Sequence, residues 1–98
     1  MYGTVAKMTV KAENIEKLRD VMGRQMQERP IPGYVTSYAL RENDSDTTWL
    51  FVVFEDRASY DANADDPAMD AQYQEYRALL ESDPEWHDGQ IEEGAPTS

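Results

Sequence analysis

The first third of the chain changes from the spacing of a strand to that of a helix. Residues 4–11 mix β-branched and polar side chains, which favours a first strand. An apolar stripe at helical spacing follows, formed by Ile15, Leu18, Met22 and Met26. Residues 28–33 read ERPIPG, and this segment ends the helix because its two prolines cannot continue it and Gly33 permits a turn.

Two more strands are predicted in the middle of the chain. Residues 34–41 alternate in character, and regular alternation places Tyr34, Thr36, Tyr38 and Leu40 on one face of the strand. After a polar loop, residues 49–54 read WLFVVF, the most apolar run in the sequence. A strand that is apolar on both faces is typical of the centre of a sheet, where both faces are covered.

The last part of the chain predicts an interrupted helix and a final strand. Glu55-Asp56 offers an N-cap for a short helix that reaches Ala64, and Asp66 can cap a second helix with Pro67 at its first position. The stripe of this main second helix consists of Met69, Tyr73, Tyr76 and Leu80. Residues 82–84 end it, and residues 86–92 supply the fourth strand.

The predicted order is therefore βαββαβ, the ferredoxin-like α+β arrangement with a four-stranded antiparallel sheet and two helices on one face. Residues 1–94 are expected to form this single domain, and residues 95–98 a disordered tail. The helices cover only one face of the apolar central strand. We expect a second copy of the chain to cover the other face, sheet against sheet, in a homodimer.

Charge and composition narrow the choice of partners. The 98 residues carry a net charge of −11, and beyond Glu42 the only basic side chains are Arg57 and Arg77. Such an acidic chain repels phosphate backbones and anionic lipids, so we expect neither nucleic acid nor membrane as a partner. No signal peptide or long apolar run is present, which predicts a cytoplasmic protein, and the lack of cysteine excludes disulfides and thiolate metal sites.

Residues 61–72, DANADDPAMDAQ, raise the question of calcium binding. Asp61, Asn63 and Asp65 alternate like the first ligands of an EF-hand loop, but Asp66 and Gln72 occupy the positions of the required glycine and bidentate glutamate. The segment is therefore interpreted as a joint between two helices, and calcium is not expected there.

Four stretches of the chain resemble the antibiotic biosynthesis monooxygenase (ABM) family of small dimeric α/β-barrel proteins. They are PGY at 32–34, WLFVVFED at 49–56, RASYDANADDP at 57–67 and DPEWHDGQ at 83–90. The resemblance implies a pocket between sheet and helices in which an electron-rich phenolic substrate itself reduces oxygen, without metal or flavin. Some members use an Asn, a Trp four residues later and a Tyr near the start of helix two. Asn63 and Tyr73 fit that spacing, whereas Pro67 stands in the place of the Trp.

Seven residues are candidates for such a site. Asn63 and Tyr73 would orient the substrate, and either His87 or a tyrosine would assist removal of the substrate proton. His87 is the obvious general base, because it is the one side chain that titrates near neutrality when unperturbed. The candidates for binding the substrate are Tyr34, Tyr38, Tyr76 and Arg77. Each also has a structural explanation: the tyrosines can be core residues with hydroxyls at the rim, Asn63 a cap, and His87 a residue at a strand edge. Strand alternation points His87 in the direction opposite to Trp86 and Asp88, so only one of these two groups can face the pocket.

The sequence therefore predicts a cofactor-independent monooxygenase acting on a small aromatic or quinol-type molecule. The alternative is a non-catalytic dimeric small-molecule-binding or stress-response module of the same fold. A haem-degrading role, known in another branch of the family, needs a histidine on helix two, and the only histidine here is His87.

Overall fold

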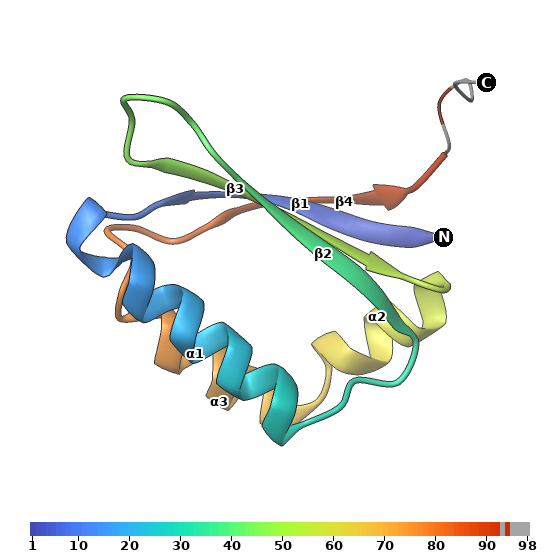
Figure 1. Cartoon of the computed structure of the whole chain (residues 1–98). Coiled ribbons are helices and arrows are strands. Elements are labelled where there is room, and N and C mark those ends of the chain that lie inside the picture. Colours follow the sequence, from blue (N-terminus) through green and yellow to red (C-terminus); the bar gives the residue numbers. More distant parts are fainter. Residues whose placement is uncertain (93, 95–98) are drawn as a thin grey trace.

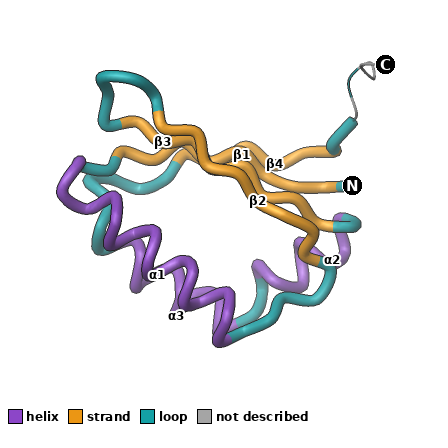
Figure 2. The backbone as a smooth tube through the Cα atoms, viewed as in Figure 1, coloured by secondary structure: helices purple, strands orange, loops and turns teal. Residues whose placement is uncertain are grey.

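Four antiparallel strands form one sheet, and all the helices lie on the same face of it (Figure 1). The computed structural model describes residues 1–92 and 94. The elements in chain order are β1 (Tyr2–Thr9), the 3-10 helix η1 (Ala12–Asn14), α1 (Ile15–Glu28), β2 (Tyr34–Arg41), β3 (Thr47–Phe54), α2 (Arg57–Ala64), α3 (Pro67–Arg77) and β4 (Glu85–Gln90). The backbone trace shows the two layers clearly (Figure 2).

The strand order is β2-β3-β1-β4, and all three pairings are antiparallel. This confirms the predicted ferredoxin-like α+β fold, with the second helix divided into α2 and α3 as expected. The predicted tail at 95–98 lies outside the described residues. Among the residues that are described, no helix is long and apolar enough to cross a membrane.

A β-bulge in β2 overturns one detail of the predicted alternation. Tyr34 pairs with Phe54, and the register then shifts so that Thr36 pairs with Val53 and Tyr38 with Phe51. The extra residue turns Tyr34 toward the helices while Tyr38 stays on the opposite face. The expectation that these two tyrosines share a face was therefore wrong.

The hydrophobic core fills one end of the space between sheet and helices. Its buried members come from β1, α1 and the region of α3, and they are Ala6, Met8, Val10, Leu18, Tyr76 and Leu80. These β1 residues belong to the C-terminal half of the strand and its continuation. The core therefore leaves the N-terminal end of β1, where Tyr2 and Thr4 face the helices, to be covered by other residues.

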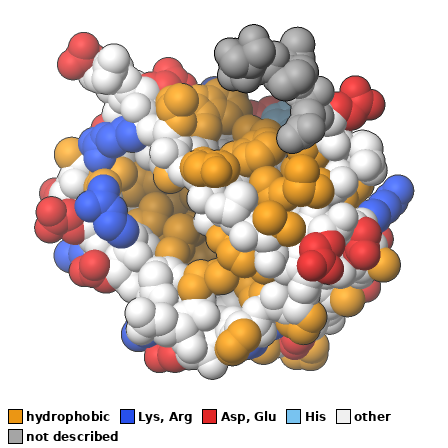
Figure 3. Space-filling model, turned by 45° about the vertical axis from the view of Figure 1, so that its right-hand side comes forward, with side chains coloured by type: hydrophobic (Ala, Val, Ile, Leu, Met, Phe, Trp, Pro, Cys, Tyr) orange, Lys and Arg blue, Asp and Glu red, His pale blue; other side chains and the backbone are white. Residues whose placement is uncertain are grey.

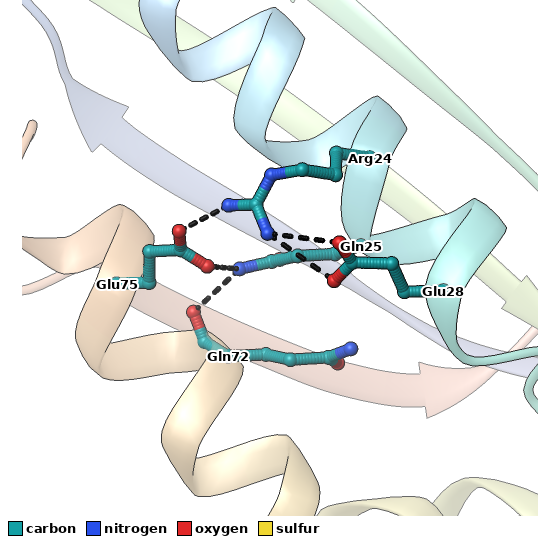
Figure 4. Close-up of polar contacts among 5 residues, drawn as sticks. All are labelled: Arg24, Gln25, Glu28, Gln72 and Glu75. Atoms are coloured by element: carbon teal, nitrogen blue, oxygen red, sulfur yellow. Dashed lines mark hydrogen bonds and ion pairs between the residues drawn. The ribbon is translucent and has the colours of Figure 1, made fainter.

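A polar clamp joins α1 to α3 beside this core (Figure 4). The amide of Gln25, which is 7% exposed, donates to the backbone carbonyl of Gln72 at 3.1 Å and to Oε1 of Glu75 at 2.9 Å. Arg24 bridges Glu75 and Glu28 on the outer side. The hydrogen bond from Gln25, followed by the contact with Arg24, lowers the pKa of Glu75, so the clamp favours the charged carboxylate.

The break between α2 and α3 answers the question raised by residues 61–72. Asp56 caps α2 by accepting from the backbone N–H of Ser59, and Asp66 caps α3 by accepting from that of Ala68. Asp61 and Asn63 lie within helical turns. The segment is a helix–helix joint, because an EF-hand needs these residues in an open loop.

Two glycines provide a matched test of the fold. A Cβ on Gly3 would lie 2.0 Å from the carbonyl oxygen of Val52, whereas a Cβ on Gly23, in α1, would meet nothing within 4 Å. We expect Gly3→Ala to lower the free energy of unfolding by about 1–3 kcal/mol through overpacking between strands. Gly23→Ala should raise it by about 0.5–1 kcal/mol, because alanine favours the helix. Urea denaturation measures both, and equal stability of the two variants would contradict the packing of β1 against β3.

Candidate functional site

A cavity of about 520 Å³ occupies the part of the interlayer space that the core leaves empty. Figure 3 shows a hollow in the molecule with hydrophobic side chains inside it. The aliphatic and thioether side chains that line the cavity are those of Met22, Met26, Ile31, Leu50, Val52, Ala64 and Met69. The aromatic lining consists of Tyr34, Phe54, Tyr60, Tyr73, Tyr76 and Trp86. The volume of the cavity and its apolar, aromatic walls suit a small, flat organic molecule.

Edge-to-face aromatic contacts hold one end of this cavity in shape. The ring of Tyr60 packs against Tyr2 at 5.2 Å and against Phe54 at 5.5 Å between centroids, and Tyr34 contacts Phe54 at 6.0 Å. Near the core, Tyr73 and Tyr76 meet in the same way at 5.3 Å. Such contacts fix ring orientations beyond what burial alone would do. The aromatic walls are therefore preformed.

A small set of polar groups also lines the cavity, and they are Thr4, Gln25, Ser37, Asn63, Asp70, Gln72 and Asp88. Asn63 is the best oriented of them, because its carbonyl oxygen accepts a hydrogen bond from Nη2 of Arg29 at 2.9 Å. Arginine has no acceptor, so the amide can take only one orientation, with Nδ2 directed away from the guanidinium. Nδ2 has no polar partner among the described residues, and Asn63 lines both this cavity and a neighbouring one of about 360 Å³.

Arg29 holds more than this amide. Its guanidinium contacts Asp66 at 3.3 Å, the side-chain oxygen of Gln72 at 3.1 Å and the sulfur of Met69 at 3.7 Å. Its side chain is only 21% exposed. The residue sits at the C-terminal cap of α1 and thereby ties the ends of all three α-helices together.

A tyrosine–carboxylate pair lies on the sheet side of the cavity. The hydroxyl of Tyr60 donates to Oδ1 of Asp88 at 2.7 Å. Burial, and after it the hydrogen bond with Asp88, raises the pKa of Tyr60. Burial, with a smaller effect of Tyr73, also raises the pKa of Tyr76. Both hydroxyls therefore stay protonated at neutral pH, and that of Tyr60 donates to Asp88.

Four of the seven residues proposed from the sequence line the cavity: Tyr34, Asn63, Tyr73 and Tyr76. Tyr34 also donates from its hydroxyl to Ser37 at 2.7 Å. The structure thus brings the proposed orienting pair, Asn63 and Tyr73, into one hollow.

The other three candidates lie elsewhere. Tyr38 is 66% exposed on the outer face of the sheet, and Arg77 contacts Asp83 at 2.8 Å and the carbonyl oxygen of Leu80 at 3.2 Å. His87 pairs with Val5 in the register and shares the outer face with it, 3.4 Å from Glu85. Strand alternation places Trp86, and not His87, in the cavity lining.

Sequence reasoning missed Arg29, Tyr60 and Asp88. Two local signals were available: Tyr60 and Asn63 are three residues apart on one helix and so share a face, and Asp88 shares its strand face with Trp86. For Arg29 there was no such signal, because its partners lie 34 to 43 residues further along the chain.

The fold and the cavity define a small α+β protein with an aromatic-lined pocket between its sheet and helices. The model of the antibiotic biosynthesis monooxygenase family matches residues 1–79. The chain therefore belongs to this family.

Solved structures with the same fold cover nearly the whole chain. SnoaB, a cofactor-independent oxygenase from Streptomyces nogalater, aligns in a mutant form with a TM-score of 0.80 and 21% identity, over 98% of this chain and 97% of its own. A monooxygenase from the gene ActVA-Orf6 of Streptomyces coelicolor, in complex with nanaomycin D, gives a TM-score of 0.84 and 18% identity, over 99% and 92%. A conserved protein from Methanosarcina mazei Go1 aligns with a TM-score of 0.76 and 15% identity, over 93% of this chain and 92% of its own. A search of curated proteins gives no match.

The Arg29 contacts can be tested through stability. We expect Arg29→Met to lower the free energy of unfolding by about 1–3 kcal/mol, because it leaves partly buried acceptors on α2 and α3 without their charged donor. Arg29→Lys should recover little of this lost stability, since a single ammonium group cannot replace the several donors of the planar guanidinium. Urea denaturation measures the change, with Arg19→Met, at an exposed position of α1, as the control. An Arg29→Met protein as stable as the wild type would contradict this arrangement.

Proposed function

We propose that this protein is a cofactor-independent monooxygenase that acts on a small aromatic, quinol-type molecule bound in the cavity. The observation that carries the proposal is the aromatic-lined hollow with the fixed donor of Asn63 on its wall. Membership of the family supports it, as does the likeness of fold to two Streptomyces oxygenases.

An electron-rich substrate supplies the electrons for this reaction. For an anthrone-type substrate, the ring CH₂ group becomes a carbonyl: one atom of dioxygen enters the carbonyl group, and the other leaves as water with the two hydrogens. Dioxygen is the oxidant and the carbon is oxidised. Deprotonation of the substrate precedes this chemistry, because the anion gives up an electron far more readily than the neutral molecule.

The proposed roles follow from placement and hydrogen-bonding capacity. Nδ2 of Asn63 donates to a substrate oxygen, and it stabilises that oxygen further when negative charge develops there. The hydroxyl of Tyr73 orients the ring from α3, while Tyr34 and Tyr76 form walls. Arg29 holds Asn63 in advance, so no reorganisation of the amide is needed when the substrate binds.

Oxygen uptake tests the proposal directly. The purified protein, supplied with a panel of anthrones, hydroquinones and flavonoid phenols, is expected to consume oxygen without added metal or flavin. Asn63→Ala should lower kcat about 100-fold, since it removes a donor at the developing oxyanion. Tyr73→Phe should also lower turnover.

Tyr38→Phe is the matched control, because it removes a tyrosine hydroxyl on the other face of the sheet and should leave turnover unchanged. Binding of the same compounds without any uptake would instead favour the alternative, a non-catalytic binding module. Pro67, in the place where the family resemblance leads one to expect a tryptophan, is the feature that favours this alternative.

The outer face of the sheet supports a homodimer as part of the proposal. Tyr38 and Leu40 are 66% and 61% exposed there, beside the partly exposed Trp49 and Phe51 of β3. Apolar side chains gathered on one face favour pairing with a second copy. His87 would then lie at this interface and outside the cavity.

Light scattering is expected to give a mass of twice 11.2 kDa. Leu40→Glu should shift the mass toward the monomer, because it places a charge in the apolar contact. Gln27→Glu adds the same charge on the exposed surface of α1 and should leave the dimer intact. A monomeric wild type would exclude this role for the outer face.

A further inference from the structure

We propose that Asp88 is the general base of this site and that the substrate is an enolisable phenol or aryl ketone, whose oxygen lies toward Nδ2 of Asn63. This inference rests on the proposed function for the class of substrate. It assigns the proton acceptor that the reaction requires, and it takes that role away from His87.

The described residues offer few other proton acceptors in the cavity. Tyr60 and Tyr76 remain protonated, because burial raises the pKa of both. His87 lies on the outer face of the sheet, beside Glu85. Among the described residues, the carboxylates that line the cavity are those of Asp70 and Asp88.

The two carboxylates differ in how they are held. Asp70 lies in the first turn of α3, on the helix side of the cavity. Asp88 accepts the hydroxyl of Tyr60 at Oδ1, and its Oδ2 has no polar partner in the described part of the chain. One oxygen is thus fixed and the other can accept a substrate proton.

The surroundings of Asp88 also favour proton transfer. The ring of Tyr60 is held between Tyr2 and Phe54, so its hydroxyl keeps the carboxylate in place. β4 is an edge strand and Asp88 is exposed to solvent, so a proton taken from the substrate can pass to water.

Tyr60, which holds the base, lies on the same helix as the amide donor. Asn63 follows Tyr60 by three residues on α2, which places both on one helix face. An aspartate serves as general base for a proton next to a carbonyl group when fixed donors stabilise the resulting enolate. The site therefore has both groups that this reaction needs. They are the carboxylate of Asp88, which Tyr60 holds, and the amide donor of Asn63.

The proposed step is a proton transfer and involves no oxidation. A C–H or O–H bond of the substrate breaks, the proton moves to Oδ2 of Asp88, and the electron pair stays on the substrate as an enolate or phenolate. The negative charge develops on the oxygen that accepts from Asn63. Dioxygen reacts only afterwards.

Hydrogen–deuterium exchange isolates this step from oxygenation. The full chain is mixed with 1,8-dihydroxyanthrone in D₂O without oxygen, and NMR follows the loss of the ring CH₂ signal. The wild type is expected to exchange this position faster than buffer alone. Asp88→Asn should reduce the protein-catalysed rate about 100-fold, the usual contribution of a positioned base, while affinity measured by fluorescence is retained. Tyr60→Phe should reduce the rate less, because the carboxylate remains.

Glu85→Gln is the matched control, since it removes a carboxylate from the outer face of the same strand and should leave the exchange rate unchanged. Exchange that depends on Asp88 without oxygen uptake would support the base and overturn the oxygenase. Oxygen uptake with wild-type exchange in Asp88→Asn would overturn the base and retain the oxygenase. An exchange rate lost in Asp70→Asn but kept in Asp88→Asn would also overturn the assignment of Asp88 as the base. A wild-type protein that accelerates neither hydrogen exchange nor oxygen uptake would overturn both proposals.

Discussion

The guanidinium of Arg29 is the contact on which the geometry of the cavity depends. It lies where α1 ends and joins Asn63 of α2, Asp66 at the break, and Gln72 of α3. Each of these groups accepts a charge-assisted hydrogen bond in a partly buried place, where such bonds are stronger than at the surface. The polar clamp of Gln25 joins only α1 and α3, whereas Arg29 also reaches α2.

The break between α2 and α3 keeps the cavity open. Pro67 cannot lie within a continuous helix, and Asp66 begins α3 in a new direction, so α2 covers one end of the sheet while α3 follows α1. The core residues of β1 then pack under α1 and α3, and the aromatic group around Tyr60 packs under α2. The chain therefore stabilises its fold at two ends and leaves a hollow between them.

Local rules explain how much of this structure could be predicted. The bounds of β2 and the caps at Asp56 and Asp66 follow from short-range chemistry, and they are as predicted. The prediction that Tyr38 shares a face with Tyr34 was wrong, because a bulge depends on pairing with β3. Alternation within one strand does not reveal such pairing. Arg29 and the Tyr60–Asp88 pair join residues 28 to 43 positions apart. Their geometry is set by tertiary packing, so the sequence supplied the cavity's aromatic character but not its charged groups.

Pro67 stands where the family resemblance predicts a tryptophan, and this affects the aromatic wall of the cavity. The position that a Trp would occupy by the family resemblance is here the first residue of α3, where proline favours helix initiation and adds no ring to the wall. The indole of Trp86 reaches the cavity from the opposite side, on β4, two residues from Asp88. An aromatic surface and a carboxylate on one strand face the amide of Asn63 on the helix side. A flat substrate that stacks on that surface would have its acidic group at the sheet and its oxygen at α2. Strand alternation places Trp86 and Asp88 on one face, and tertiary packing sets them opposite Asn63.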